Sequence, residues 1–267
     1  MINIKSPSIM GICNITNDSF SDGGVNYRKK DALKNIKLML DYGATIIDIG
    51  AESTRPGSDP ISYNEEIKRL SPILKALPKN KFIISIDTNK IETQEFALKC
   101  GVHIINDIFG GSEELFQLSK KYHNGLILMH TPAAPKIMQN KINSYDDVVN
   151  DIKKYFKNKL KIIDKEKIPH KKIWFDPGIG FGKNLNQNLQ IINRINDLKI
   201  KKCGIAIGLS RKSWINKIDG SKVGNRIGGS LASIIYCLNK KVDIFRVHDV
   251  HDTKQAIAIY KKLKCIK

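Results

Sequence analysis

The sequence lacks any apolar run of about 18 residues, the shortest stretch that spans a membrane as a helix. Residues 1–10 carry no signal-peptide pattern. Paired cysteines are also lacking, because the five in the chain are odd in number, widely spaced and form no CxxC pair (Cys13, Cys100, Cys203, Cys237 and Cys265). This pattern argues against structural disulfides and structural zinc. We therefore expect a cytoplasmic protein with no membrane partner.

Arginine is scarce, since only seven of the 45 basic residues are Arg. The formal net charge of +19 suggests a nucleic-acid or anion partner. However, the lysines are spread over every predicted helix surface, and no basic stripe interleaved with aromatic residues stands out. We therefore expect no nucleic-acid partner. In so lysine-rich a chain, an Arg beside a glycine turn is more informative.

The 267 residues, 41% of them hydrophobic, suffice for a sizeable core. No linker, internal repeat or low-complexity block interrupts the chain, so we expect residues 1–267 to form one domain. Short β-rich apolar runs alternate with helical patterns from end to end. The eight runs cover residues 9–15, 45–49, 82–86, 102–105, 126–129, 173–175, 204–209 and 244–247.

The segments between these runs have helical spacing and recognisable ends. Ser62 and Glu65 form a capping-box pattern, and Gly43 follows an earlier helix as its C-terminal glycine. Ser144 is predicted to open a longer helix. Eight βα units in one domain predict a single (β/α)8 TIM barrel of the α/β class. The alternative is a doubly wound open sheet, which usually has a glycine fingerprint after its first strand, and residues 16–20 have none.

Every predicted strand ends in polar or charged residues, whereas the strand starts show nothing comparable. Each alone has a structural explanation: Asp87 could cap a helix, and His130 could be a hydrogen-bonded core residue. Eight ends that converge on one rim indicate a ligand site, because buried polar groups need partners. The strand-end groups are Asn14, Glu52 to Arg55, Asp87, Asn106, Asp107, His130, Asp176, Ser210 to Lys212, and Arg246 to Asp249.

One group of strand-end residues suits an anion. Arg55, Arg246, His248 and the Asn14 amide come from the first, second and eighth strands, which are neighbours in a closed barrel. Arginine matches phosphate oxygens in geometry and in charge. A substrate-bridging Mg²⁺ fits the Asn14 corner, because Mg²⁺ prefers oxygen ligands.

A second group suits a flat heterocycle with an amidine-like edge. It comprises Asp87, Asn106, Asp176 and Lys212, from the third, fourth, sixth and seventh strands. A carboxylate accepts hydrogen bonds from two adjacent N–H groups, an amide pairs with ring nitrogens, and a lysine donates to a carbonyl oxygen.

The stretch 173–183 runs from apolar residues into Asp176 and then a loop with three alternate glycines and Lys183. A phosphate cradle is the first hypothesis for such a loop. The glycine spacing fits neither the dinucleotide fingerprint nor the P-loop, whose lysine precedes Ser or Thr rather than Asn184. We therefore leave Lys183 out of the predicted site, and expect the glycines to let substrate rings approach.

These motifs together resemble the dihydropteroate synthases, the folate-pathway enzymes that sulfonamides inhibit. The resemblance covers nearly the whole chain. It is carried by residues 10–24, 50–57, 85–88, 105–107, 176–183, 208–213 and 246–250. It implies a TIM barrel, a homodimer and a Mg²⁺-dependent transferase. This enzyme condenses p-aminobenzoate with 6-hydroxymethyl-7,8-dihydropterin diphosphate and releases pyrophosphate.

The resemblance also implies a role for each site residue. The pterin would contact Asp87, Asn106, Met129, Asp176 and Lys212. The diphosphate would contact Asn14, Arg55, Arg246 and His248, with Asn14 also meeting the metal. The p-aminobenzoate pocket would comprise Phe20, Thr54, Pro56, Phe181 and Ser213. Asp87, Asp176, Lys212 and Arg55 would carry the catalytic charges, as pyrophosphate departs first and the amine then attacks the pterin methylene cation.

The chain departs from the family pattern at a few positions. Asn17 stands where the first mobile loop usually has Pro, so that loop should be less restrained. Ala51 replaces a usual Gly, which argues against a positive φ there. Two rivals remain open: a pterin-binding methyltransferase barrel, which needs no diphosphate site, and a nucleic-acid-binding or scaffold barrel without catalysis.

Overall fold

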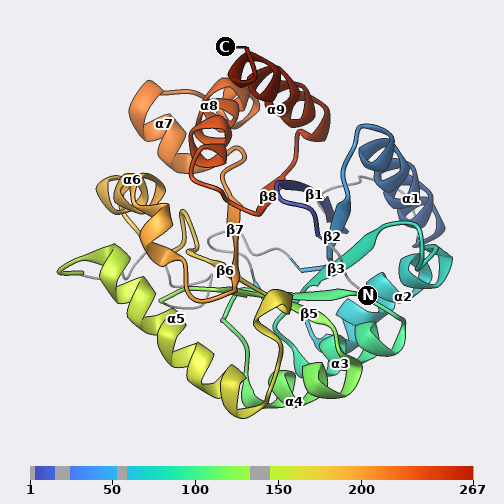
Figure 1. Ribbon diagram of the computed structural model, residues 1–267. Coiled ribbons are helices and arrows are strands. Elements are labelled where there is room, and N and C mark those ends of the chain that lie inside the picture. The colour runs from blue at the N-terminus through green and yellow to red at the C-terminus, as the bar shows by residue number, and fades with distance from the viewer. Residues whose placement is uncertain (1–3, 16–24, 53–58, 133–144, 267) are drawn as a thin grey trace.

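The computed structural model describes residues 4–15, 25–52, 59–132 and 145–266, with the backbone alone for residues 25–28. Within these ranges eight parallel strands close into a barrel (Figure 1). The predicted (β/α)8 barrel is confirmed, and the open sheet is excluded because β8 pairs with β1. The strands are β1 (Ser8–Asn14), β2 (Ile46–Gly50), β3 (Ile83–Asp87), β4 (Ile104–Asp107), β5 (Gly125–Met129), β6 (Ile173–Asp176), β7 (Gly204–Gly208) and β8 (Ile244–Val247).

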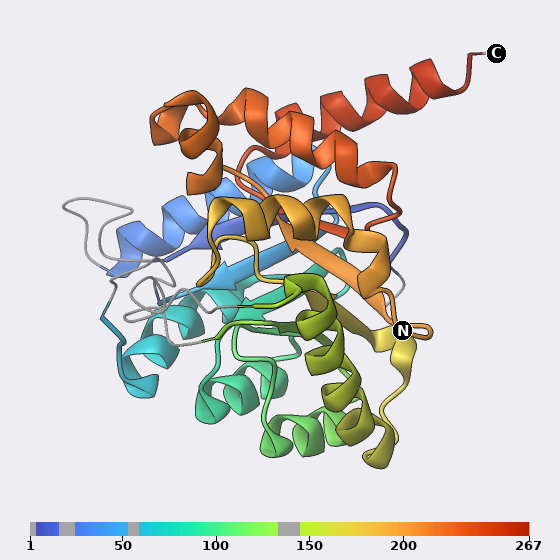
Figure 2. The same ribbon diagram turned by 90° about the vertical axis from the view of Figure 1, so that its left-hand side faces the viewer.

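Helices surround the barrel and cover the outer faces of the strands (Figure 1). In the side view of Figure 2 the strand arrows point away from the end at which the N-terminus lies. The helices are α1 (Val25–Asp41), α2 (Tyr63–Ala76), α3 (Ile91–Lys99), α4 (Glu113–Tyr122), α5 (Val148–Lys165), α6 (Leu185–Asn193), α7 (Ser213–Asp219), α8 (Ile227–Leu238) and α9 (Val250–Lys264).

The predicted helix ends are confirmed at two places and wrong at one. Ser62 caps α2 by accepting a hydrogen bond from the Glu65 backbone N at 3.3 Å. Gly43 follows α1 with a φ of 97°. The prediction that Ser144 opens a helix is wrong; Ser144 itself lies outside the described residues. Helix α5 begins only at Val148, because the Asp147 carboxylate caps it through the first-turn N–H groups.

The side chains that point into the barrel form two layers, because residues alternate between the faces of each strand. The lower layer is an apolar cluster of Met10, Ile46, Ile104, Ile127, Trp174, Ala206 and Ile244. Trp174 fits there because Gly125 and Gly204 on the neighbouring strands carry no side chain. Two residues further along these strands the same face becomes polar: Asp48 follows Ile46, Asp176 follows Trp174 and Arg246 follows Ile244.

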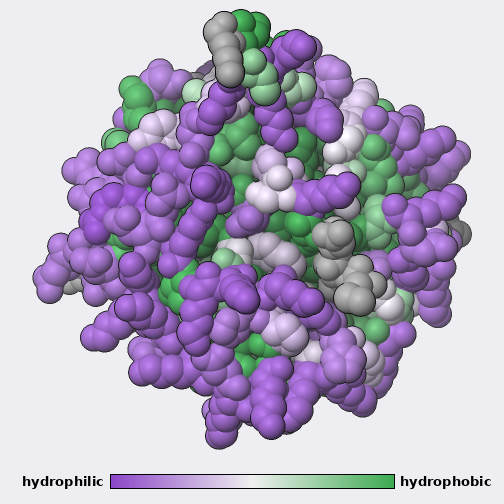
Figure 3. All heavy atoms as spheres, in the orientation of Figure 1, coloured by the Kyte–Doolittle hydropathy of each residue, from purple (hydrophilic) through white to green (hydrophobic). Residues whose placement is uncertain are grey.

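The outer surface is predominantly hydrophilic on the face shown in Figure 3, where apolar residues form only separate patches. Among the described helices, none is long and apolar enough to span a bilayer.

The contact between Gly204 and Trp174 gives a test of the lower layer. A Cβ on Gly204 would lie 2.2 Å from Trp174 Cδ1. We expect Gly204→Ala to lower the free energy of unfolding by about 1–3 kcal/mol, because the indole must leave its packed position. Gly228→Ala is the control, since a Cβ there meets nothing within 4 Å and lies in α8. It should stabilise by about 0.5–1 kcal/mol. Urea unfolding measures both, and equal midpoints would contradict the packing argument.

Candidate active site

The upper layer brings predicted site residues from successive strands to one level. Asn14 of β1 lies opposite Gly50 of β2, which lies opposite Asp87 of β3, which lies opposite Asn106 of β4. Gly50 contributes no side chain at this level. A Cβ there would lie 3.5 Å from both Asn14 Oδ1 and Asp87 Cβ. Because Gly50 has no side chain, the Asn14 amide and the Asp87 carboxylate can lie near each other at the mouth of the barrel.

A guanidinium shared by two carboxylates forms the floor of the site. Arg246 Nε donates to Asp48 Oδ2 at 2.6 Å, and its Nη2 donates to Asp87 Oδ2 at 2.7 Å. Asn106 Nδ2 also donates to Asp48 Oδ2, at 3.0 Å. The sequence analysis placed Arg246 with the anion group and apart from Asp87. The structure joins the two groups through this one side chain.

Asp48 is a site residue that the sequence analysis missed. It is fully buried, and its carboxylate positions both Arg246 and Asn106. A signal was present, because Asp48 is an acid within the otherwise apolar strand β2 and has the interior parity of Ile46 and Gly50. An unpaired acid at such a position is costly, so a cation from another strand was to be expected.

The carboxylates of Asp87 and Asp176, both predicted to bind the pterin, are buried and can accept further hydrogen bonds. Asp87 Oδ1 has no hydrogen-bond partner among the described residues. Desolvation raises the pKa of Asp87, and the opposing charge of Arg246 limits the rise. Asp176 Oδ1 accepts from Gly178 N at 2.7 Å, and desolvation raises the pKa of this carboxyl as well. A ligand edge with N–H donors would satisfy such buried acceptors.

Lys212 and Phe181 meet across the site although the sequence analysis assigned them to different subsites. The Lys212 ammonium lies 4.5 Å from the centre of the Phe181 ring. Desolvation lowers the pKa of Lys212 to about 8, and the charge of Asp176 opposes this shift. Met129 lies opposite Asp176 in the register of β5 and β6 and is buried. These four residues line the side of the site formed by β5, β6 and β7.

The remaining predicted residues lie at the rim. His248 is exposed, and its backbone N and ring Nδ1 lie 3.2 and 3.1 Å from Ser210 Oγ. Ser213 is the exposed first residue of α7. Four predicted residues lie outside the described ranges: Phe20, Thr54, Arg55 and Pro56. Asn17, whose substitution concerned the first loop, also lies outside them. Ala51 has no positive φ, as expected.

The glycines of the 178–182 loop have a packing role beyond the one expected. Gly178, Gly180 and Gly182 all have positive φ, which side chains disfavour. A Cβ on Gly178 would lie 2.1 Å from the His130 carbonyl oxygen, so this glycine is required by its contact with the end of β5. A Cβ on Gly180 would lie 3.4 Å from Lys212 Cδ. The loop therefore packs between the His130 carbonyl and the Lys212 side chain.

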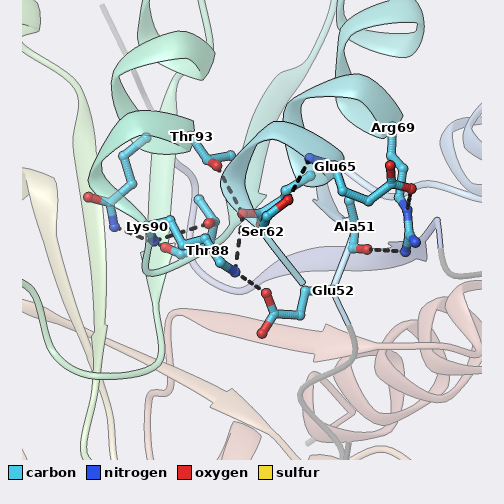
Figure 4. A network of polar contacts seen from close by, with 10 residues as sticks. Ala51, Glu52, Ser62, Glu65, Arg69, Thr88, Lys90 and Thr93 are labelled. Carbon is cyan, nitrogen blue, oxygen red and sulfur yellow. Dashed lines mark hydrogen bonds and ion pairs between the residues drawn. The ribbon is translucent and has the colours of Figure 1, made fainter. Parts of the chain in front are cut away.

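Two cationic side chains bind Ala51 and Glu52, which precede residues 53–58 (Figure 4). The sequence analysis missed both cations. Arg69 of α2 donates to the Ala51 carbonyl at 3.0 Å. Lys90 pairs with the Glu52 carboxylate, and its Nζ lies 3.4 Å from the fully buried Glu66. The chain thus leaves β2 with its backbone and its first acidic side chain both anchored.

The described part of the site offers few oxygen ligands for a metal ion. Among the described residues no group of three His, Cys, Asp or Glu side chains could hold an ion. The Asn14 amide oxygen faces the bare backbone of Gly50. One amide oxygen at the mouth of a site fits an Mg²⁺ that arrives with substrate phosphates and keeps several waters, rather than a cation held by the protein alone.

Comparisons with known proteins agree with this geometry. A family model described as "Pterin binding enzyme" matches residues 10–248. The dihydropteroate synthase of Escherichia coli (strain K12) is 39% identical over 261 residues, which cover 97% of this chain and 92% of that protein. The Yersinia pestis dihydropteroate synthase, solved with a sulfonamide drug complex, is 34% identical with a TM-score of 0.89 and 98% coverage of both chains. The Burkholderia cenocepacia dihydropteroate synthase, complexed with 7,8-dihydropteroate, is 30% identical with a TM-score of 0.87, covering 97% of this chain and 92% of that one.

The buried imidazole of His130 makes stability depend on pH. Its ring packs edge-on against Tyr155 at 5.0 Å, and Nδ1 has no partner among the described residues. Desolvation, followed by the charge of Lys183, lowers its pKa from 6.5 to about 3. Below pH 6.5 the unfolded chain therefore binds a proton that the folded chain refuses, and the fold loses stability as the pH falls.

We expect the His130→Gln variant to gain stability relative to the native chain as pH falls from 7.5 to 5. The quantity compared is the free energy of unfolding. Urea titrations at four pH values measure this. A constant offset for His130→Gln would contradict the assignment.

Proposed function

The chain belongs to the dihydropteroate synthases of the pterin-binding enzyme family, and we propose that it joins p-aminobenzoate to 6-hydroxymethyl-7,8-dihydropterin diphosphate with release of pyrophosphate. The observation that carries the proposal is the buried Asp87 and Asp176 pair, with Asp87 Oδ1 unpartnered among the described residues and Lys212 opposite. A pterin has an amino-pyrimidine edge that donates to carboxylates and a ring carbonyl that accepts from an ammonium.

The pterin lies in the upper layer of the barrel in this proposal. Asp176 and Asp87 accept from its N–H groups, the Asn106 amide contacts ring nitrogens, Lys212 donates to its carbonyl, and Met129 packs on the ring. The two carboxylates also favour positive charge on the ring system. They therefore stabilise the methylene cation that forms as pyrophosphate departs.

The diphosphate is held by Asn14, Arg246 and His248, with Arg55 added on the resemblance. Arg246 uses Nε and Nη2 in its ion pairs, whereas Nη1 has no acceptor among the described residues and can meet a phosphate oxygen. Mg²⁺ would bind through Asn14 and supply further positive charge to the leaving group. The amine of p-aminobenzoate then attacks from the side of Phe181 and Ser213, to which the resemblance adds Phe20, Thr54 and Pro56.

The rival methyltransferase barrel is disfavoured by the cations of the site. It would use the Asp and Asn contacts to a pterin but has no diphosphate to bind. Arg246 is paired with Asp48 and Asp87, Lys212 is drawn to Asp176, and both suit a substrate with a large negative charge. Desolvation lowers the pKa of His248 to about 4, so its neutral ring would add a hydrogen bond rather than a charge.

We further propose that residues 1–267 act as one domain in a cytoplasmic homodimer. An apolar groove of about 450 Å³ between α6, α7 and α8 is a candidate for the contact between subunits. Its lining includes Leu189, Trp214, Ile218 and Tyr236, and three of these are exposed. Sedimentation equilibrium tests this part, and a monomer at micromolar concentration would overturn it.

The proposed reaction has a direct assay. With Mg²⁺ and both substrates the protein should form dihydropteroate, a sulfonamide should inhibit it, and a chelator should abolish activity until Mg²⁺ is restored. No product from folded protein at saturating substrate would sink the proposal.

Asp176→Asn tests the pterin contact. We expect a loss of roughly 10²-fold or more in kcat/KM, because a charge aimed at the developing cation is removed. Asp243→Asn is a matched control at the other end of the barrel. Its carboxylate accepts from the Ile205 backbone N at 2.9 Å, as Asp176 does from Gly178 N, but lies far from the rim. Near-native activity of Asp176→Asn would show that this carboxylate is misassigned.

A further inference from the structure

Lys183 ends the glycine loop, and the proposed reaction gives it no role. Its side chain is only 4% exposed. The ammonium donates to the Gly178 carbonyl at 2.9 Å, the Phe181 carbonyl at 3.0 Å and the His130 carbonyl at 3.4 Å. An ammonium has three protons, and three backbone oxygens receive them. The protons that a phosphate would require are therefore already used.

These three hydrogen bonds link the residue that follows β5 to the loop that follows β6. His130 follows β5, whereas Gly178 and Phe181 belong to the loop that follows β6. Gly178 also lies too close to the His130 carbonyl to carry a side chain. The left-handed conformations of the loop glycines allow two of its carbonyls to point at one nitrogen. The loop thus folds around the Lys183 ammonium.

The other side of the same loop faces the substrate groups. Gly178 N donates to Asp176 Oδ1 at 2.7 Å, and the Phe181 ring lies 4.5 Å from the Lys212 ammonium. From α6, Asn188 holds the loop by accepting from Gly180 N at 2.7 Å and donating to the Lys183 carbonyl at 3.1 Å. The Phe181 carbonyl accepts from the Lys183 ammonium, and the Phe181 backbone N donates to the Gly178 carbonyl at 3.1 Å. The Gly178 carbonyl also accepts from Lys183, so both backbone contacts of Phe181 lead to the buried ammonium.

We propose that Lys183 is a positioning residue that sets the place of Phe181, and thereby the affinity of the site for the aromatic amine. This inference rests on the proposed function and assigns a determinant of one substrate's binding within it. Without the ammonium, the His130 and Phe181 carbonyls lose their donor, whereas the Gly178 carbonyl keeps the bond from Phe181 N at 3.1 Å. This loss costs free energy until the loop moves to let water reach the two oxygens. Such a movement displaces Phe181 directly. Asp87, Asn106 and Arg246 are linked through Asp48 and do not bond to the loop. Of the proposed pterin contacts, only Asp176, through Gly178 N, and Lys212, which faces the Phe181 ring, meet it.

Lys183→Met removes the donors and keeps most of the length of the side chain. We expect the KM for p-aminobenzoate to rise about tenfold, since small misplacements of positioning groups are costly. The KM for the pterin diphosphate should rise by a clearly smaller factor, because only Asp176 and Lys212 among its proposed contacts meet the loop. Assays at pH 6.5 favour the protonated form of the native side chain, because desolvation lowers the pKa of Lys183 to about 7. Hydrogen exchange of peptides covering residues 176–188 should accelerate.

Lys199→Met is the matched control. Lys199 also donates to a backbone carbonyl, that of Lys241 at 2.9 Å, but between loops at the opposite end of the barrel. It should leave both KM values and the exchange of residues 176–188 unchanged. If Lys183→Met does not fold, Lys183→Gln carries the same test, because its amide keeps two donors without the charge.

The outcomes separate the inference from the proposed function. A native enzyme that forms no dihydropteroate removes the proposed function, and the exchange measurement then still decides whether Lys183 holds the loop. An active enzyme whose Lys183 variant has a native KM for p-aminobenzoate, whatever its thermal stability, overturns the inference alone. Equal increases in both KM values would overturn it too, because they would indicate a general loss of the site.

Discussion

The site depends on one guanidinium placed inside a closed barrel. Arg246 lies between Asp48 and Asp87, and Asp48 also receives the Asn106 amide. Any of these charges alone would be costly in the barrel interior, so they are stable only as a group. The group exists because four strands, far apart in sequence, bring their interior positions to one level. Closure between β1 and β8 is what places Arg246 beside β2 and β3.

The hydrogen-bonding capacity of these carboxylates is satisfied only in part, which is typical of a binding site rather than of a purely structural core. Asp48 Oδ1 and Asp87 Oδ1 remain without partners among the described residues, and Asp176 has a single backbone donor. Desolvation raises the pKa of Asp87 and Asp176 and lowers that of Lys212. Each shift disfavours the charged form, and a ligand with complementary N–H and carbonyl groups restores it. Lys183 supports this layer indirectly, because it binds the Gly178 carbonyl while Gly178 N donates to Asp176.

Much of the fold followed from the sequence for physical reasons. Eight apolar runs with polar ends predicted the strands to within two residues, because parallel strands buried on both faces leave a strong local signal. The start of α5 was wrong, because Ser144 and Asp147 are both acceptable caps and only packing selects between them.

The convergence of the strand-end residues followed from the sequence, whereas their connectivity did not. Asn14, Asp87, Asn106, Asp176, Lys212 and Arg246 do converge, since strand ends meet at one rim. The pairing of Arg246 with Asp48 and Asp87 joins residues up to 198 positions apart, and no local pattern encodes it. The glycine and lysine spacing led us to leave Lys183 out of the predicted site, but its three carbonyl bonds depend on loop conformations that appear only in three dimensions.

The central claim is that the pterin edge binds the carboxylate layer while the diphosphate lies towards Asn14 and His248. A crystal structure of the protein with the pterin diphosphate bound tests it most directly. The account predicts the amino-pyrimidine edge on Asp87 and Asp176, with phosphate oxygens beside Arg246 and His248. Phosphate density within the glycine loop at Lys183, or a pterin bound away from the two carboxylates, would contradict it.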